Sequence, residues 1–338
     1  MSIYNEASDA ARPKSGLRLC DIPAHDPFVV ADERSGMYYL YTSGGPRIHG
    51  MERYGVVTYR SADLRHWEGP YVVFTVPDGI WANPQHGTWA PEVHAYKGSC
   101  YLFVTLHNND RRLPDSPLIP MPNHWRGTAV AVSSSLEGPF ELLQSEGPTT
   151  PSSLMTLDGT LYIDETDGSP WMVYCHEWIQ TRDGTVEAVP LEADLSRAAG
   201  EPVHLFRASE ASWDTAEQTP GVEGSIYVTD GCQLYRTRGG HLVMLWSSYD
   251  QGQYVQTQAR SVSGRLEGPW EQLEPLVRGD SGHGMLFRTF EGTPMLILHQ
   301  PFRMPDSRCK LYAMEDTGDR FRVVTAREDL HGPEEDVR

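Results

Sequence analysis

Residues 23–44 read PAHDPFVVADERSGMYYLYTSG, a hairpin pattern that decides the fold because the rest of the chain repeats it. The proline after Asp26 holds that aspartate in an extended conformation. FVV then begins a strand, and a turn containing glycine joins it to a second strand, MYYLYT. Asp26 is therefore expected at the start of a strand, on the rim of a sheet. A single Asp-Pro at such a place is typical of a turn whose aspartate caps its own backbone. Only a repeat of the motif along the chain would favour a functional role for Asp26.

Four more hairpins of the same kind follow along the chain. They are WAPEVHAY with CYLFVTLH, LDGTLYID with PWMVYCHEW, VTDGCQLYR with LVMLWSSY, and GHGMLFRTF with PMLILHQP. A second hairpin follows each of the first four units, and CKLYAMEDTGDRFRVV closes the series in shorter form. This pattern predicts an all-β fold, a five-bladed β-propeller with four-stranded antiparallel blades around a central channel, as one domain over residues 1–338. Tandem β-sandwiches also contain many short strands, but they do not repeat one leading motif five times.

The leading positions of the five units are separated by 66, 66, 72 and 53 residues, and the blades are expected to start near residues 26, 89, 158, 230 and 283. These positions are Asp26, Glu92, Asp158, Asp230 and His283. The first strand of a propeller blade is innermost, so their side chains are expected around one funnel. Carboxylates crowded into one pocket repel each other when ionised, which raises one pKa and leaves another low. Such a pair supplies an acid and a base at the same pH.

The chemistry that uses this pair best is hydrolysis of a glycosidic bond. One carboxyl protonates the leaving oxygen while the other takes a proton from water, and a separation of roughly 6.5–9.5 Å leaves room for that water and inverts the anomeric centre. Substrate contacts are expected from Trp89, Glu92, His176, from Trp178 at the end of the third blade's second strand, and from His283. Two simpler interpretations stay open: repeated aspartates also cap turns, and a histidine between two glycines also fits a packed core position.

Composition excludes several classes of partner. The formal charge of −18 disfavours nucleic acid and anionic membranes, which require a basic face, and favours a neutral carbohydrate. Five scattered cysteines predict reduced structural thiols. The first 20 residues contain no apolar segment of the kind a secretory signal requires, so a cytoplasmic location is expected.

The motifs HDPFVV, WAPEVHAYKGSCYLFV, LDGTLYIDETDGSPWMVY and GHGMLF resemble glycoside hydrolase family 43, over roughly residues 18–325. The resemblance implies a five-bladed propeller enzyme that inverts the anomeric centre, acts mostly in exo mode, and releases arabinofuranose, xylose or galactose units. It implies Asp26 as general base, Asp158 as the residue that modulates the pKa of the acid and orients substrate, and His283 at the channel axis. No cofactor is required, although a structural calcium or sodium ion near His283 is compatible with the pattern.

The general acid is where the sequence departs from the family. The family usually has Glu-Gly-Pro at the start of the fourth blade, whereas this chain has VTDGCQ, which places Asp230 and Cys232 there. Three candidates remain: Asp230, Glu177 in CHEW, and Glu223 in GVEGSIYV. A second departure is Glu92, where the family frequently has aspartate.

The sequence therefore predicts an exo-glycosidase that releases terminal α-L-arabinofuranose. A β-D-xylosidase, a β-D-galactofuranosidase and a carbohydrate-binding propeller without hydrolysis are the alternatives. Residues 107–127 and 207–225 form the longest predicted rim loops, and specificity is expected to depend on them.

Overall fold

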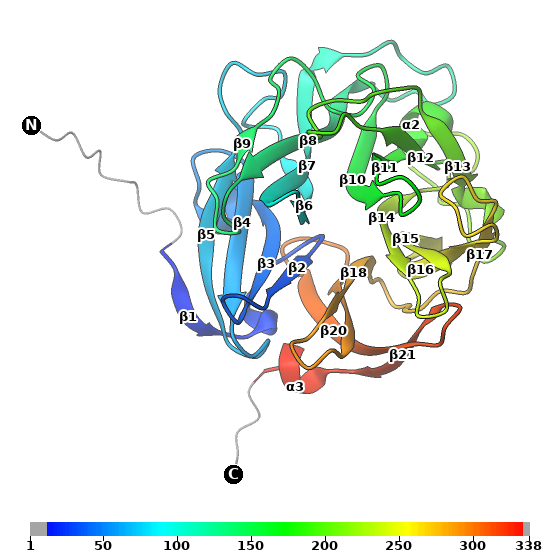
Figure 1. Cartoon of the computed structure of the whole chain (residues 1–338). Helices are drawn as coiled ribbons and strands as arrows, with labels where there is room; N and C mark the ends of the chain where they lie inside the picture. Colours follow the sequence, from blue (N-terminus) through cyan, green and yellow to red (C-terminus); the bar gives the residue numbers. More distant parts are fainter. Residues whose placement is uncertain (1–11, 334–338) are drawn as a thin grey trace, which may run out of the picture.

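The computed structural model describes residues 12–333, so part of the stretch examined for a targeting signal lies outside the described residues. Figure 1 shows five sheets arranged in a ring, with β2, β6, β10, β14 and β18 nearest the centre. Each sheet is antiparallel, and the strands follow one another from the centre outward in chain order. The prediction of a five-bladed β-propeller is confirmed.

The strands have the following bounds. Blade 1 contains β2 (Phe28–Asp32), β3 (Met37–Gly44), β4 (Gly55–Ser61) and β5 (Trp67–Thr75). Blade 2 contains β6 (Thr88–Tyr96), β7 (Ser99–Arg112), β8 (His124–Ser133) and β9 (Glu141–Leu142). Blade 3 contains β10 (Thr156–Ile163), β11 (Pro170–His176), β12 (Thr185–Pro190) and β13 (Val203–Arg207). Blade 4 contains β14 (Asp230–Arg236), β15 (Leu242–Asp250), β16 (Gln253–Ser261) and β17 (Trp270–Gln272). Blade 5 contains β18 (Gly282–Arg288), β19 (Pro294–Gln300), β20 (Arg308–Asp316) and β21 (Phe321–Ala326).

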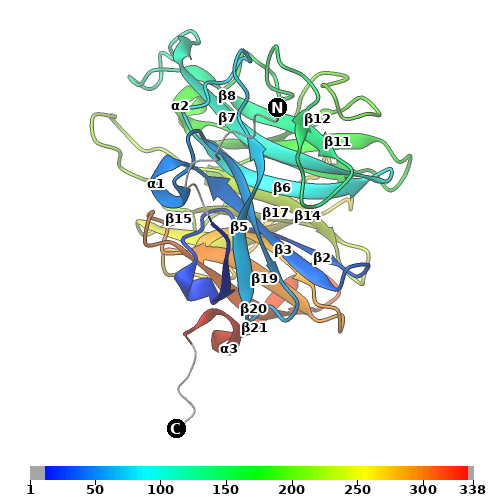
Figure 2. The same ribbon diagram turned by 90° about the vertical axis from the view of Figure 1, so that its left-hand side faces the viewer.

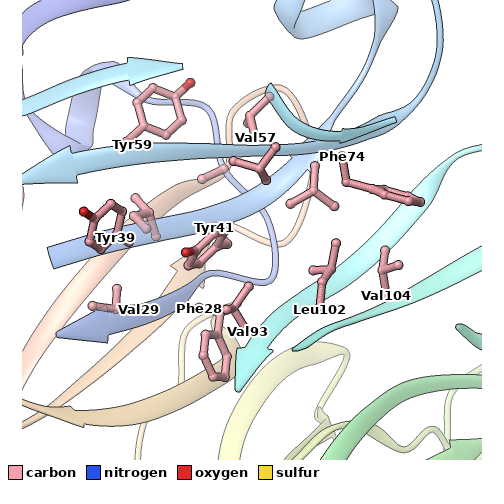
Figure 3. Packing of buried hydrophobic residues seen from close by; sticks show 14 of the residues in the cluster. Phe28, Val29, Tyr39, Tyr41, Val57, Tyr59, Phe74, Val93, Leu102 and Val104 are labelled. Atoms are coloured by element: carbon pink, nitrogen blue, oxygen red, sulfur yellow. The ribbon is translucent and has the colours of Figure 1, made fainter. Parts of the chain in front are cut away.

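Neighbouring blades pack face to face, which explains the apolar composition of the second strands. In β15 the first seven residues are all buried, because the sheet is covered on both faces. Figure 3 shows the same packing between blades 1 and 2, where Tyr41 and Phe74 lie beside Leu102 and Val104. Burying each such side chain stabilises the fold by about 1.5–3 kcal/mol. This packing fixes the blades, and therefore the inner strands, relative to one another.

Blade 1 differs from the prediction by a fifth strand. β1 (Lys14–Leu17) pairs with β5 at the outer edge of this sheet. The segment that follows β1 contacts blade 5, since the Arg308 Nε donates a hydrogen bond of 2.8 Å to the carbonyl of Cys20 and the Arg18 guanidinium donates one of 2.7 Å to the carbonyl of Asp329. Asp329 lies in α3 (Glu328–His331), next to β20 and β21 in Figure 2. The ring is thus closed by contacts between the two ends of the described chain.

Among the described residues, no helix combines the length and the apolar character that crossing a membrane requires.

Candidate active site

One residue at the start of each inner strand has a left-handed backbone conformation. The φ values are 49° at Asp26, 43° at Ala90, 55° at Asp158, 62° at Gly231 and 48° at His283. In blades 2 to 5 the pairing of the first two strands shifts register at this point, which is a β-bulge. Residues in this conformation cost free energy and cluster at functional sites. The bulges therefore mark the structurally equivalent positions of the five blades.

This equivalence corrects the predicted series at two blades. Ala90, and not Glu92, is the bulge residue of blade 2, and Gly231 follows Asp230 in blade 4. Glu92 lies two residues further along β6, where it is 2% exposed and pairs with His94 Nε2 at 2.8 Å and with the Gln233 amide. It does not line the active-site cavity, so its place inside the channel differs from the predicted substrate contact.

A cavity of about 660 Å³ opens at the bulge end of the inner strands. It brings together most of the predicted site residues, namely Asp26, Asp158, Glu177, Asp230, His283, Trp89 and Trp178. His176 lies outside its lining, where its Nε2 is 2.9 Å from Gln180 Oε1 and its Nδ1 is 3.3 Å from Glu187 Oε1. Glu223 is exposed and also lies outside the lining.

Asp26 is surrounded by imidazoles. Its Oδ1 lies 2.8 Å from His25 Nδ1 and 3.2 Å from His283 Nδ1. The other ring nitrogen of His25 is 2.8 Å from the carbonyl of Phe302, so both nitrogens face acceptors and His25 must be an imidazolium to donate to both. Burial alone raises the pKa of Asp26, but the charges of His25 and His283 outweigh it and hold that pKa well below its usual range. Asp26 is therefore ionised.

The backbone around Asp26 is fixed by two blades. The hydroxyl of Thr42 on β3 donates a hydrogen bond of 2.7 Å to the carbonyl of His25. The Asp26 N–H donates to Nδ1 of His299 on β19 at 3.2 Å, so this ring nitrogen is an acceptor. The carboxylate is thus held at the junction of blades 1 and 5.

Asp158 accepts a hydrogen bond of 2.9 Å from the Gly231 N–H and lies 3.6 Å from His283 Nδ1. Burial, followed by the charges of Asp230 and Asp26, raises its pKa well above the ordinary value. Gly231 is required at its position, because φ is +62° and a Cβ there would lie 3.0 Å from the His283 ring. Cys232, the departure from the family's proline, donates its thiol to the carbonyl of Asp158 at 3.3 Å. The VTDGCQ sequence thus supports Asp158 from blade 4.

Asp230 is, with Asp158, a cavity carboxyl whose pKa the structure raises. The hydroxyl of Tyr254 donates to its Oδ2 at 3.0 Å. Burial raises the pKa of Asp230 to about 8, and the negative charges of Glu177 and Asp26 act in the same direction. Asp26 thus has a lowered pKa, whereas those of Asp230 and Asp158 are raised, a difference of the kind that acid and base catalysis requires.

Glu177 is the N-cap residue of α2 (Trp178–Thr181), and its side chain makes no capping hydrogen bond. Instead it forms a buried ion pair with the guanidinium of Arg126 on β8. The predicted place of Trp178 at the end of a strand is wrong: β11 ends at His176, and Trp178 begins α2. Its side chain nevertheless lines the cavity.

The two long rim loops meet on one side of the cavity. Leu113 and Ile119 from residues 107–127 pack in one apolar cluster with Val222, Ile226 and Ile179. Ile226 also lines the cavity. Sequence spacing could not show this contact, because 79 residues, 128–206, separate the loops. It ties both loops to α2, whereas only the second loop lines the cavity, through Glu217 and Thr219.

Asp214, in the second rim loop, gives a prediction about stability. Its Oδ2 accepts a hydrogen bond of 2.6 Å from the Ser248 hydroxyl, whereas its buried Oδ1 has no hydrogen-bond partner within residues 12–333. Burial raises its pKa to about 8 from 3.8, so the folded protein keeps a proton that the unfolded chain releases in this range. Stability is lost as pH rises from about 4 to about 8, by at most about 1.4 kcal/mol per pH unit. We expect Asp214→Asn to remove this loss.

Thermal unfolding of wild type and Asp214→Asn between pH 4 and 9 measures the effect. The Tm of Asp214→Asn, relative to that of wild type, should increase as pH rises to 8 and stay constant above pH 8. A difference that is the same at pH 5 and pH 8.5 would show that Asp214 is ionised in the folded protein.

Several site residues were not predicted from the sequence: His25, His299, Tyr254 and Arg126. A signal for His299 was present, because His176 and His299 lie at or next to the ends of second strands, in YCH and ILH. Arg126 and Tyr254 carried no such signal, since both lie on outer strands of their blades and reach the site only through packing.

The calcium or sodium ion near His283 stays a prediction. His283 faces Asp26 and Asp158, whereas calcium prefers six to eight oxygen ligands. In the described part of the chain, ligand atoms within 4.8 Å of one another are found in His25, Asp26 and His299. The two imidazoles stack at 3.8 Å and 23°, so their ring nitrogens cannot both point at one ion, and His299 Nδ1 already accepts the Asp26 N–H. These residues form a hydrogen-bonded network and do not fit a metal site.

Comparison with known families is decisive for this site. The model of the family described as glycosyl hydrolases family 43 matches residues 21–312, which include all the carboxylates of the cavity. The chain belongs to this family. The enzyme is therefore a glycoside hydrolase that acts on carbohydrate, as the resemblance in the sequence predicts.

Solved structures agree with this assignment. An endo-arabinase from Bacteroides thetaiotaomicron VPI-5482 is 35% identical with a TM-score of 0.77, covering 89% of this chain and 98% of that one. An endo-1,4-β-xylanase from the same organism is 21% identical with a TM-score of 0.66, covering 90% and 95%. An exo-1,5-α-L-arabinanase from a bovine ruminal metagenomic library is 17% identical with a TM-score of 0.62, covering 90% and 97%; the last two likenesses show the fold alone. Comparison of this chain with curated proteins found no match.

Proposed function

We propose that this enzyme is an inverting exo-glycosidase that releases terminal α-L-arabinofuranose from oligosaccharides or polysaccharides. The observation that carries the proposal is one cavity in which Asp26 is held ionised and Asp230 protonated. An ionised carboxylate and a carboxylic acid acting on one glycosidic bond are the two groups that this hydrolysis requires.

The proposed reaction uses one water molecule. Asp26 takes a proton from this water as its oxygen bonds to the anomeric carbon, and the bond from that carbon to the leaving oxygen breaks. Asp230 gives its proton to the leaving oxygen. The sugar leaves with inverted configuration, Asp26 is then protonated and Asp230 ionised, and exchange with solvent restores both. Asp158, beside Asp230 in the same cavity, orients the sugar and modulates the pKa of Asp230.

Arabinose is favoured because the 35% identical relative is described as an endo-arabinase. The β-D-xylosidase and β-D-galactofuranosidase alternatives use the same carboxylates, so the part of the cavity wall formed by Trp178 and the second rim loop has to distinguish these sugars. We further propose that no cofactor takes part, and that the enzyme works in the cytoplasm, where its five free thiols would stay reduced.

Internal cleavage is a second candidate, since the same relative is described as acting in endo mode. The cavity of about 660 Å³ is also larger than one monosaccharide needs, and lies in the range of pockets that hold drug-sized ligands.

Product analysis tests the proposal. Purified enzyme is assayed on the 4-nitrophenyl glycosides of α-L-arabinofuranose, β-D-xylopyranose and β-D-galactofuranose, and on linear arabino-oligosaccharides. We expect turnover of the arabinoside, release of arabinose alone from the oligosaccharides, and an inverted anomer in the first NMR spectra. Early release of di- and trisaccharides would show that the enzyme cleaves internal bonds, and would overturn the proposed exo mode. Turnover of only the xyloside or galactofuranoside would overturn the sugar assignment.

A further inference from the structure

Arg126 is a buried cation that touches the cavity wall without belonging to the pair proposed to catalyse hydrolysis. It lies on β8, is 8% exposed, and forms its ion pair with Glu177 across the boundary between blades 2 and 3. The same guanidinium lies over the ring of Trp89 on β6, 4.6 Å from the ring centroid. Glu177 and Trp89 both line the cavity. One side chain therefore joins two cavity residues from different blades.

The remaining contacts of Arg126 hold it in this place. Its Nε lies 3.2 Å from Nδ1 of His107 on β7, and its Nη2 lies 3.2 Å from Nε2 of His124 on β8. Each of these imidazole nitrogens accepts a guanidinium proton, which requires neutral rings. The His107 ring also packs edge-on against Trp89, with centroids 4.2 Å apart. The guanidinium thus has partners on several sides, a geometry that its planar array of donors suits and that a lysine cannot reproduce.

We propose that Arg126 is a positioning residue that fixes Glu177 and Trp89 as the part of the cavity wall that binds the sugar. Trp89 is 41% exposed in a protein that buries most of its large side chains, so its free face is available to a sugar ring. Glu177 offers its second oxygen to sugar hydroxyls while Arg126 occupies the first. This inference rests on the proposed function, since it names the residues that hold the substrate of that reaction.

Arg126 is also the counter-charge of Glu177, whose negative charge acts on Asp230. The groups that face it are His107, His124, Glu177, the nearby His86 and, beyond Glu177, Asp230. Burial and the Arg126 charge lower the pKa of His107 well below its usual value and that of His124 to about 4, which agrees with the neutral rings that the hydrogen bonds require. Removing the cation leaves the negative charge of Glu177 beside Asp230 without a counter-charge, which makes ionisation of Asp230 less favourable.

The test compares Arg126→Gln and Arg126→Lys with wild type on 4-nitrophenyl α-L-arabinofuranoside across pH 5–9. For Arg126→Gln we expect KM to rise about tenfold or more, kcat/KM to fall about 100-fold, and the basic limb of the pH profile to move to higher pH. For Arg126→Lys we expect the same basic limb as in wild type, because the positive charge is kept. We expect a raised KM, because lysine loses the stacking on Trp89 and the planar set of guanidinium donors.

Matched controls are Arg260→Gln and Arg260→Lys. Arg260 on β16 pairs with Glu271 at 2.6 Å on the outer edge of blade 4, far from the cavity lining, and both changes should leave KM and the pH profile unchanged. Circular dichroism shows whether each variant is folded. If Arg126→Gln does not fold, the inference is tested with Arg126→Lys alone. An Arg126→Gln enzyme that is folded and has the wild-type KM and basic limb would overturn the inference.

Failure of the proposed function is distinguishable from failure of this inference. If wild type hydrolyses none of the glycosides, the proposed function fails, and calorimetry with an arabino-oligosaccharide takes over the test. Binding that Arg126→Gln weakens at least tenfold would still support the inference, whereas equal binding by both proteins would overturn it.

Discussion

Replacing Asp26 with asparagine is expected to lower kcat/KM by about 10³- to 10⁴-fold on every substrate of the enzyme. Asparagine keeps the shape of the side chain but cannot take a proton from water. The effect should be independent of the leaving group, because the attack of water needs the base whichever alcohol departs. Kinetics on an aryl arabinoside and on an arabino-oligosaccharide, at equal enzyme concentration, measure it.

The imidazoles around Asp26 make this a test of charge as well as of proton transfer. His25 donates to Asp26 Oδ1 from one nitrogen and to the Phe302 carbonyl from the other, so in Asp26→Asn its positive charge loses its counter-ion. The pKa of His25, which Asp26 raises against the effect of burial, should then fall. NMR titration of the His25 ring measures this change independently of activity.

Asp32→Asn is the matched control. Asp32 ends the same strand that Asp26 precedes, and it caps the β2–β3 turn through a 2.6 Å hydrogen bond from the Ser35 hydroxyl. The control should keep wild-type activity, since it changes an aspartate of the same blade outside the cavity. Asp26→Asn with activity within tenfold of wild type would remove Asp26 from the role of base.

The propeller itself could be predicted from the sequence because each blade repeats two apolar strands around a glycine turn. β1 could not, because KSGL has no alternation of apolar and polar residues and pairs only at the edge of a finished sheet. The predicted ring was right for Asp26, Asp158 and His283, whose left-handed backbone repeats from blade to blade. It was misaligned at Glu92 because blade 2 has Ala90 at the bulge position, and the nearest carboxylate lies two residues further along β6.

Long-range contacts were the other part that the sequence could not provide. Glu177 was a candidate acid by its place after a strand, and nothing near it in the chain indicates Arg126, which lies 51 residues earlier. The pKa of Asp230 depends in the same way on burial and on Glu177, which belongs to another blade. Sequence reasoning can therefore name the carboxylates, whereas their protonation follows from packing.

Asp230→Asn is expected to slow hydrolysis to an extent that depends on the leaving group of the substrate. Hydrolysis of an arabino-oligosaccharide, whose alkoxide leaving group needs a proton, should fall by about 10²- to 10⁴-fold. Hydrolysis of the 4-nitrophenyl arabinoside should fall much less, because nitrophenolate leaves without protonation. The basic limb of the pH profile, which in wild type reflects loss of the Asp230 proton with a pKa of about 8, should disappear on the aryl substrate.

Glu177→Gln distinguishes the two candidate acids. If Asp230 is the acid, this change removes a negative charge that raises the pKa of Asp230, so the basic limb moves to lower pH. Its losses should be similar for aryl and oligosaccharide substrates, since Glu177 then contributes to binding and not to proton transfer. The opposite pattern, with Glu177→Gln selectively impaired on the oligosaccharide and Asp230→Asn equally impaired on both, would transfer the role of acid to Glu177. The two variants therefore give opposite signatures, and together they assign the proton that the leaving oxygen receives.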